Sequence, residues 1–272
     1  MTAWKWLLSV GVVAGSSLAL FSAGGDDDEA SARLEALAGR YEFFADASRK
    51  AKFERERKPL LKYTNPVRGE VSGSVFVWTH QGRPEVIAAV FDYRTERTIY
   101  SELHTLARAG TVGDRDGKEF WKPPEAGAKF QAVPGAPGPA ESEPARLLQM
   151  RELARGFTVE RTHPEHGKEA MRLLPSPVFR YASPLTGTRD GGIFVFADAT
   201  TDPEAFLVLE ATAGDKPRWH YAFARTNIVE FRAEYKGELA WGVPAVGWAT
   251  VYDQHEPYAI VRENPPRGFV RK

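Results

Sequence analysis

The sequence predicts an α+β protein that is mostly antiparallel β-sheet, internally duplicated about a pseudo-twofold axis, with one long helix in each unit. Alternating β-branched and aromatic residues around a Gly-Arg-Pro break predict two strands and a tight connection over residues 73–93. A second copy of this pattern begins at Gly191, 118 residues after Gly73. A helical pattern precedes each copy. A single curved sheet through both units is the alternative arrangement.

The first 24 residues have the features of a secretory signal peptide. Lys5 supplies a positive charge, residues 6–21 are mainly apolar, and small residues follow up to Gly24. The apolar run is shorter than the ~20 strongly apolar residues that a membrane span needs, which favours cleavage. The sequence therefore predicts a secreted or periplasmic protein, with an uncleaved N-terminal membrane anchor as the alternative.

Composition limits the classes of function that the chain can have. Its 272 residues include 36 basic and 36 acidic side chains and no cysteine. Balanced charge gives no global field to attract nucleic acid or anionic lipid, so we expect no nucleic-acid partner and membrane contact only through the N-terminal segment. The absence of cysteine excludes disulfides, thiol catalysis, cysteine metal sites and iron–sulfur clusters. We expect no cofactor and no metal.

After the signal peptide, the chain divides into two units and a tail. We expect repeat unit 1 at residues 25–131, a Pro/Gly-rich linker at 132–144, repeat unit 2 at 145–250 and a C-terminal tail at 251–272. The proline-rich composition of the linker is typical of a connection between units rather than of an element inside one.

Each unit is expected to begin with a helix and to continue with about five strands. Apolar residues at spacings of three and four predict an amphipathic helix from Ala30 to about Arg57 in unit 1. Pro144 is expected to begin the helix of unit 2. Proline suits the first turn of a helix, because a backbone N–H at that position would have no partner in the helix. In unit 1, β-favouring runs predict strands within residues 59–66, 73–78, 85–93, 98–106 and 118–121.

The match between the two units extends beyond the hairpin. Seven residues have identical partners 118 positions later: Pro59, Tyr63, Pro66, Gly69, Gly73, Phe76 and Val77. One inserted residue then shifts the match, so that Pro84-Glu85 aligns with Pro203-Glu204. The order of these matches indicates a tandem duplication, and such units commonly pair as an isologous dimer does.

Two kinds of position are candidates for ligand binding: a histidine–arginine pair that occurs in both units, and residues at which the two units differ. His104 with Arg108 and His220 with Arg225 occupy similar places in the two units and could bind an anion or a carboxylate. Ordinary alternation on a half-exposed strand is the preferred explanation of both pairs. Trp78 and Arg83 lie where the two copies differ in sequence. The predicted binding set is His104, Arg108, His220, Arg225, Trp78 and Arg83.

Catalytic and metal signals are weaker. No catalytic residue is assigned, because the chain has no G-x-S-x-G elbow, phosphate loop or dinucleotide fingerprint. His163 and His166 have a spacing that a metal ion could use, but no third ligand is evident and a solvated loop is preferred. Glu85 and Glu204 are matched carboxylates, each after a proline at a strand start.

Two functions remain open. The first is a non-catalytic exported binding or scaffold module for a small molecule, glycan or protein. The second is a hydrolase of an envelope or extracellular polymer. The runs Trp78–Val86, Pro134–Pro137 and Ala145–Arg155 resemble a family of exported bacterial proteins of unknown function. That resemblance implies export and a shared fold, and it transfers no catalytic residue or substrate.

Overall fold

The computed structural model of the protein describes residues 23–67 and 70–263. All but the last two positions of the expected signal peptide lie outside these residues. None of the described helices is both long and apolar enough to span a membrane.

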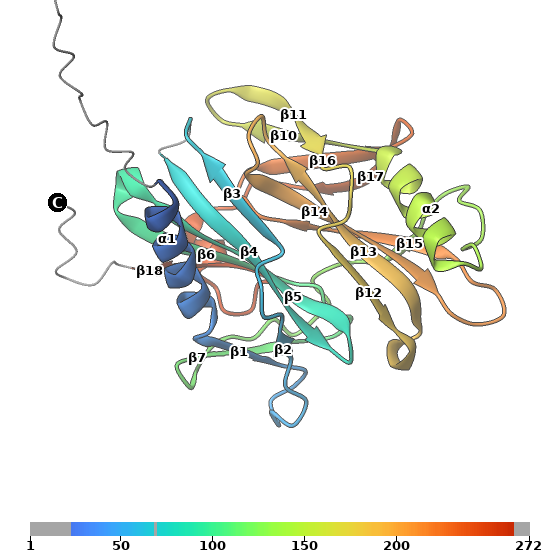
Figure 1. Ribbon diagram of the computed structural model, residues 1–272, viewed down its shortest axis with the longest axis horizontal. Helices are drawn as coiled ribbons and strands as arrows, with labels where there is room; N and C mark the ends of the chain where they lie inside the picture. The colour runs from blue at the N-terminus through green and yellow to red at the C-terminus, as the bar shows by residue number, and fades with distance from the viewer. Residues whose placement is uncertain (1–22, 68–69, 264–272) are drawn as a thin grey trace, which may run out of the picture.

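Two antiparallel sheets pack face to face, and one helix covers the outer face of each (Figure 1). The strands alternate apolar side chains between two faces, so each sheet contributes to the layer between the sheets and to an outer core beneath its helix. In the first sheet Val75 and Val77 face the partner sheet, while Phe76 and Trp78 face the helix. The inter-sheet layer is the part of the fold that positions the polar clusters described below.

The first half of the chain forms two sheets. Its elements are α1 (Ala23–Ala38), β1 (Tyr41–Phe44), β2 (Glu54–Arg55), β3 (Leu61–Asn65), β4 (Val71–His80), β5 (Arg83–Tyr93), η1 (Arg94–Glu96), β6 (Thr98–Thr105), β7 (Val112–Arg115) and β8 (Lys118–Trp121). The larger sheet has the order β18-β6-β5-β4-β2, with β3 also on β4, and the smaller one has the order β1-β7-β8.

The second half forms one nine-stranded sheet. Its elements are β9 (Gln131–Ala132), α2 (Glu143–Arg155), β10 (Phe157–His163), β11 (Gly167–Leu173), β12 (Phe179–Ser183), η2 (Pro184–Thr186), β13 (Thr188–Ala197), β14 (Pro203–Thr212), β15 (Trp219–Arg225), β16 (Glu230–Tyr235), β17 (Glu238–Val243), α3 (Trp248–Val251) and β18 (Tyr258–Glu263). The order is β17-β16-β10-β11-β13-β14-β15-β9, with β12 on β13. Of these, β18 joins the first sheet.

The two halves have the same order of α-helix and strands and nearly the same strand pairing. Each has one helix followed by eight strands, β1–β8 and β10–β17. The pairs β1–β7–β8, β2–β4, β3–β4, β4–β5 and β5–β6 correspond to β10–β16–β17, β11–β13, β12–β13, β13–β14 and β14–β15. The halves differ at one junction, because β10 pairs with β11 whereas β1 and β2 share only an isolated bridge between Phe44 and Lys52.

The predicted α+β fold with one long helix per unit is wrong, although the prediction of mainly antiparallel sheet is confirmed. The helix expected from Ala30 to Arg57 ends at Ala38, and α2 has only 13 residues. Gly39 follows the end of α1, and the aromatic run Tyr41–Phe44 then forms a strand. The spacing of three and four continued through these aromatics and concealed the change from helix to strand.

The end of the chain belongs to the first sheet. Residues 251–272 were expected to form a tail, but β18 pairs with β6 from Tyr258 opposite His104 to Glu263 opposite Ile99. The chain therefore crosses back from its second half to the first. The returning segment and β6 together form part of the wall of a cavity.

Candidate functional site

Each half of the molecule contacts the tip of the other half's hairpin. At one end of the inter-sheet layer, the Ser183 hydroxyl of β12 donates to the Gln81 carbonyl in the β4–β5 turn, at 2.7 Å. At the other end, the Thr64 amide of β3 donates to the Thr201 hydroxyl in the β13–β14 turn, at 3.2 Å. The two contacts join corresponding elements in reciprocal directions, as in an isologous interface.

The end that contains the β4–β5 turn, here called the Arg83 end, holds a buried and charge-balanced network. Arg83 is 1% exposed and donates from Nε to Glu210 at 2.8 Å, and its Nη1 lies 3.0 Å from Glu85. Glu210, also 1% exposed, accepts further bonds from Arg108 at 2.7 Å and from the Tyr181 hydroxyl at 2.8 Å. Two arginines therefore neutralise two carboxylates.

Burial also changes the acidity of the Arg83 end. Burial raises the pKa of Glu85 to about 7, the nearby Arg83 opposes this shift, and Glu210 adds to it. Both arginines also lie over the ring of Phe130, with centroid distances of 5.1 Å for Arg83 and 5.8 Å for Arg108. Glu85 is thus a carboxyl group that changes charge near neutral pH inside a packed layer.

The opposite end, here called the Asp202 end, is richer in carboxylates. The Asn65 side-chain amide donates to Asp198 at 2.9 Å and to Asp202 at 3.1 Å. Glu204 accepts from Asn227 at 3.0 Å and from Arg161. Asp198, Asp202 and Glu204 bring carboxylate oxygens within 4.8 Å of one another.

Glu102 lies on the inter-sheet face of β6, and its pKa is affected by the charges of Asp202 and Glu204. Burial, followed by the charges of Asp202 and Glu204, raises its pKa well above the ordinary range. Among the residues that the structure describes, the Asp202 end thus holds more acidic than basic groups, in contrast to the balanced Arg83 end.

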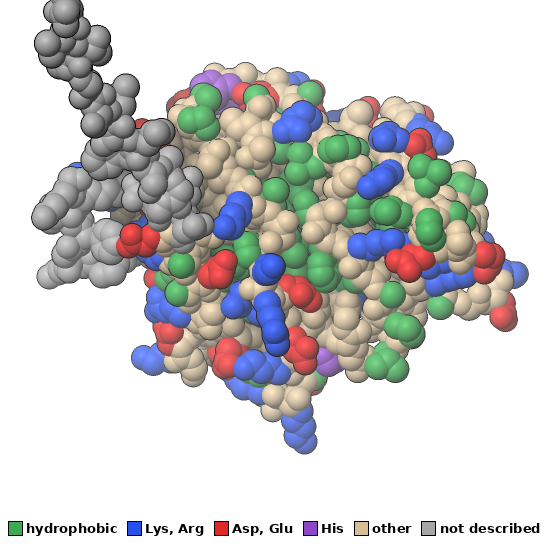
Figure 2. Space-filling model, viewed as in Figure 1, with side chains coloured by type: hydrophobic (Ala, Val, Ile, Leu, Met, Phe, Trp, Pro, Cys, Tyr) green, Lys and Arg blue, Asp and Glu red, His purple; other side chains and the backbone are tan. Residues whose placement is uncertain are grey.

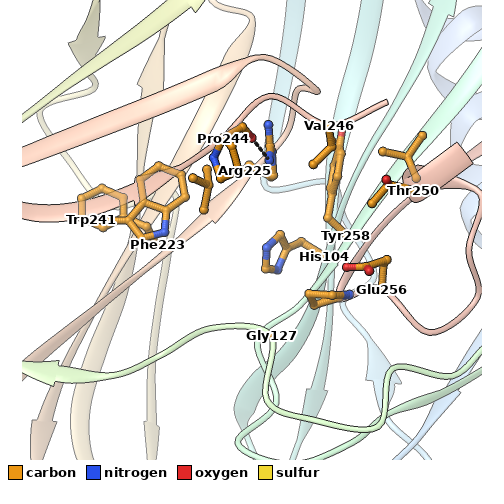
Figure 3. Close-up of a pocket in the computed structure, with 13 residues that line it drawn as sticks. His104, Gly127, Phe223, Arg225, Trp241, Pro244, Val246, Thr250, Glu256 and Tyr258 are labelled. Atoms are coloured by element: carbon orange, nitrogen blue, oxygen red, sulfur yellow. Dashed lines mark hydrogen bonds between the residues drawn. The ribbon is translucent and has the colours of Figure 1, made fainter. Parts of the chain in front are cut away.

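A cavity of about 220 Å³ lies where β6, β15 and the returning segment before β18 meet (Figure 3). Phe223, Trp241 and Tyr258 form much of its wall. The Trp121 indole N–H donates to the Glu256 carbonyl at 2.7 Å, which fixes the returning segment to the first half of the molecule. Tertiary contacts thus hold this wall in place, and the cavity exists before any ligand binds.

His104 points its ring into this cavity and is neutral (Figure 3). Its Nδ1 lies 2.9 Å from the Thr105 carbonyl, which can only accept, so Nδ1 carries the proton and Nε2 keeps a lone pair. Burial lowers the pKa of His104 to about 4, an effect that the Thr105 contact opposes and Arg225 reinforces. His104 therefore offers the cavity a hydrogen-bond acceptor.

Arg225 lines the cavity as a fixed part of its wall. Its nitrogens donate to the backbone carbonyls of Asn227 at 2.7 Å, Pro244 at 2.9 Å and Val229. Its guanidinium carbon also lies 5.5 Å from the centroid of the Tyr258 ring. Because these carbonyls hold the guanidinium, the geometry does not favour the anion site that the sequence suggested.

A groove of about 400 Å³ lies next to the cavity, between β15 and β17. These strands lie near opposite ends of the nine-stranded sheet, which curls into a half-barrel. Across the opening, the Tyr221 hydroxyl donates to the Ala240 carbonyl at 3.1 Å. Phe223 and Trp241 stack at 5.1 Å and line both the cavity and the groove. The cavity and the groove therefore share part of their walls.

The structure divides the predicted binding residues among different places. His104 and Arg225 meet at the cavity, whereas Arg83 and Arg108 meet at Glu210. Trp78 is 1% exposed beneath α1, edge-on to Phe43 with ring centroids 4.9 Å apart, and it lines none of these spaces. His220 lies on β15 opposite Glu210 and Ala132.

Strand register shows that His104 and His220 are not equivalent. In the first sheet Gly73 faces Phe91, which faces Tyr100. In the second sheet Gly191 faces Glu210, which faces His220. His220 therefore occupies the place of Tyr100. By the same register Ile87 faces His104 and Phe206 faces Ala224, so His104 occupies the place of Ala224.

Sequence reasoning did not identify Glu210 or Tyr258 as site residues. Glu210 had a usable signal, because it stands between the apolar run Phe206–Leu209 and Ala211 in a β-favouring stretch. A charged residue in such a run implies a buried partner. Tyr258 had no such signal, since the residues around it were assigned to a tail.

The chain matches no protein-family model, no curated protein and no solved structure. Its function therefore has to be argued from its own residues.

Proposed function

We propose that the protein is an exported, non-catalytic binding module that holds a small molecule in the cavity between β6 and β15. The observation that carries this proposal is the preformed cavity, with aromatic walls and one neutral imidazole acceptor. Preformed apolar spaces with a few fixed polar groups are the usual form of a ligand site. The apolar N-terminal sequence supports export.

The chemistry of the walls defines the ligand class. At about 220 Å³ the cavity is smaller than most sites for drug-sized ligands. Phe223 and Trp241 favour a flat apolar group, and His104 Nε2 favours a hydrogen-bond donor. Arg225 already bonds to backbone carbonyls and is not positioned to pair with a carboxylate. The ligand is therefore a small, neutral, planar molecule with one donor group.

The hydrolase alternative receives less support from the geometry. The two matched glutamates lie at opposite ends of the inter-sheet layer. Glu85 forms an ion pair with Arg83 at one end. Glu204 forms an ion pair with Arg161 and accepts a hydrogen bond from Asn227 at the other. A glycosidase needs two carboxyl groups that flank one bond. These glutamates instead serve the packing of the two halves.

We also infer that the two halves arose by duplication and have kept a fused-dimer arrangement. The common strand pairing supports this, as do the reciprocal hairpin contacts. A further parallel is steric. A Cβ on Gly73 would lie 2.3 Å from the Tyr63 ring, and a Cβ on Gly191 would lie 2.6 Å from the Tyr181 ring. Each tyrosine therefore requires glycine on the neighbouring strand.

Phenol and indole are suitable probes, because both are flat and donate one hydrogen bond. Calorimetry should show binding to the full chain, and Trp241→Ala should abolish it. Replacing His104 by leucine should weaken binding roughly fivefold, the effect of one net hydrogen bond. Benzoate, which is an anion of similar size, should bind more weakly than phenol.

Leu185→Ala is the matched control, because Leu185 is 81% exposed in η2 and should leave affinity unchanged. Failure of both probes to bind would contradict the proposal. So would binding that persists unchanged in Trp241→Ala and His104→Leu, provided that both variants keep the wild-type circular dichroism spectrum.

A further inference from the structure

The tip of the β10–β11 hairpin brings two histidines and a glutamate together. His163 ends β10 and faces Gly167, the first residue of β11, which leaves a loop of Pro164, Glu165 and His166. Gly167 has a φ of +73°, a left-handed conformation that glycine adopts at no steric cost. The strand ladder therefore fixes where His163 stands, and the short loop returns His166 to its side.

The donor atoms of these three side chains lie close together. One atom from each of His163, Glu165 and His166 falls within a group whose members are all within 4.8 Å of one another. The two imidazole rings are nearly parallel, with centroids 4.5 Å apart. Glu165 and His166 are exposed, and Figure 2 shows histidine side chains at the edge of the molecule over this hairpin. An ion can reach the group directly from solvent.

We propose that His163, Glu165 and His166 bind a divalent transition-metal ion, such as zinc, copper or nickel. Imidazole nitrogens with a carboxylate oxygen are the ligands that these ions select, whereas calcium and magnesium prefer oxygen alone. Three protein ligands with one position left for water is a common zinc arrangement. Sequence alone suggested only two ligands here, and the turn supplies Glu165 as the third.

The local geometry supports capture at His163 Nδ1. The backbone N–H of Glu165 donates to this nitrogen at 3.1 Å, so Nδ1 carries a lone pair. A metal ion takes the same lone pair, and the displaced N–H can turn to water in an exposed loop. Zinc–nitrogen bonds of ~2.0–2.1 Å require the three donors to move closer, which rotation of the exposed Glu165 and His166 side chains allows.

The test is calorimetric titration of the full chain with zinc, copper and nickel chlorides, with magnesium chloride as the contrasting ion. We expect one bound transition-metal ion per chain and no heat from magnesium. His163→Ala and His166→Ala should each weaken binding by at least about tenfold, since even loss of a group that only orients a ligand has that effect. Glu165→Gln should cause a smaller loss.

His255→Ala is the matched control, because His255 is exposed and lies 3.0 Å from a single carboxylate, Asp253. It should bind metal as the wild type does. The electron paramagnetic resonance spectrum of the copper complex should show two imidazole nitrogens, and one in either single histidine variant. Absence of one-to-one binding, or equal affinity in the His163→Ala/His166→Ala double variant, would overturn the proposal.

Discussion

The two ends of the inter-sheet layer have similar architecture and different electrostatics. Each end places a tyrosine, Tyr181 or Tyr63, over a glycine of the neighbouring strand. The strand that carries the tyrosine also hydrogen-bonds to the hairpin turn of the other half, through Ser183 or Thr64. At the Arg83 end the residue before the matched Pro-Glu pair is an arginine. At the corresponding position of the other end stands Asp202. This exchange of sign is one difference between the balanced network and the acidic one. Another is Glu210, because the corresponding place in the first sheet holds Phe91.

This difference shows which features the packing requires and which it tolerates. The tyrosine over glycine recurs because the ring can lie across the paired strand of its own sheet only where no Cβ intervenes. Charge is less constrained, provided that each buried carboxylate has donors. Glu210 obtains them from two arginines and Tyr181, whereas Asp198 obtains them from Asn65 and Thr200. The same fold thus accommodates two different polar solutions.

Removal of Arg83 should cause the largest loss of stability. In Arg83→Met, Glu85 and Glu210 stay buried without their shared cation, so the free energy of unfolding should fall by about 3–5 kcal/mol at pH 7. Urea denaturation followed by circular dichroism measures this. Adding Glu210→Gln to the same chain should recover part of the loss, because the uncompensated charge is removed.

Asp202→Asn is the matched change at the other end. It keeps the shape of the side chain and an oxygen that can accept from the Asn65 amide, so the free energy of unfolding should fall by less than in Arg83→Met. An equal loss in Arg83→Met and Asp202→Asn would show that the two ends are electrostatically alike, against the comparison drawn above.

The paired tyrosines give a smaller contrast. The Tyr181 hydroxyl donates to the buried Glu210 carboxylate at 2.8 Å, and loss of a hydrogen bond to a charged group costs about 1.5–3 kcal/mol. Tyr181→Phe should therefore lower the free energy of unfolding by about that amount. Tyr63→Phe, which leaves the same ring over Gly73, should cost less than half as much in the same urea series. Equal costs would contradict the assignment of Glu210 as the group that distinguishes the ends.

The sequence predicted the two hairpins well, because the residues that define a hairpin are close together in the sequence. Alternating side chains and turn residues define β4, β5, β13 and β14, and identical residues such as Tyr63 and Tyr181 can be aligned without a structure. The long first helix was mispredicted for the same local reason. Its apolar spacing continues through Tyr41 and Phe44, which the structure places in a strand.

The site was less predictable because its residues meet only through tertiary structure. His104 and Arg225 were identified by residue type, but their partners depend on the strand register and on β18, which returns from the far end of the chain. Trp78 was misleading, since a tryptophan in a buried strand packs in the core more often than it binds. No local pattern encodes the contact of Trp241 with Phe223 across the half-barrel opening.

The pH dependence of stability gives the subtlest test of the Arg83 end. Glu85 has a pKa of about 7 in the folded protein and an ordinary value of 4.5, so the folded state holds a proton that the unfolded chain has lost between these pH values. Stability from this group is therefore present at low pH and is lost as the pH rises from 4.5 through 7. Glu85→Gln removes that loss. The variant should gain on the order of 1–3 kcal/mol relative to wild type between pH 5 and pH 8.

Unfolding free energies of wild type and Glu85→Gln at a series of pH values measure this difference directly. His104 contributes the opposite slope, because its pKa of about 4 lies below the ordinary 6.5 and its contribution is lost as the pH falls between those values. Since both proteins contain His104, that slope cancels when the two curves are subtracted. Parallel curves would mean that Arg83 keeps Glu85 ionised throughout, and the Arg83 end would then be a permanent ion-pair network rather than a titrating one.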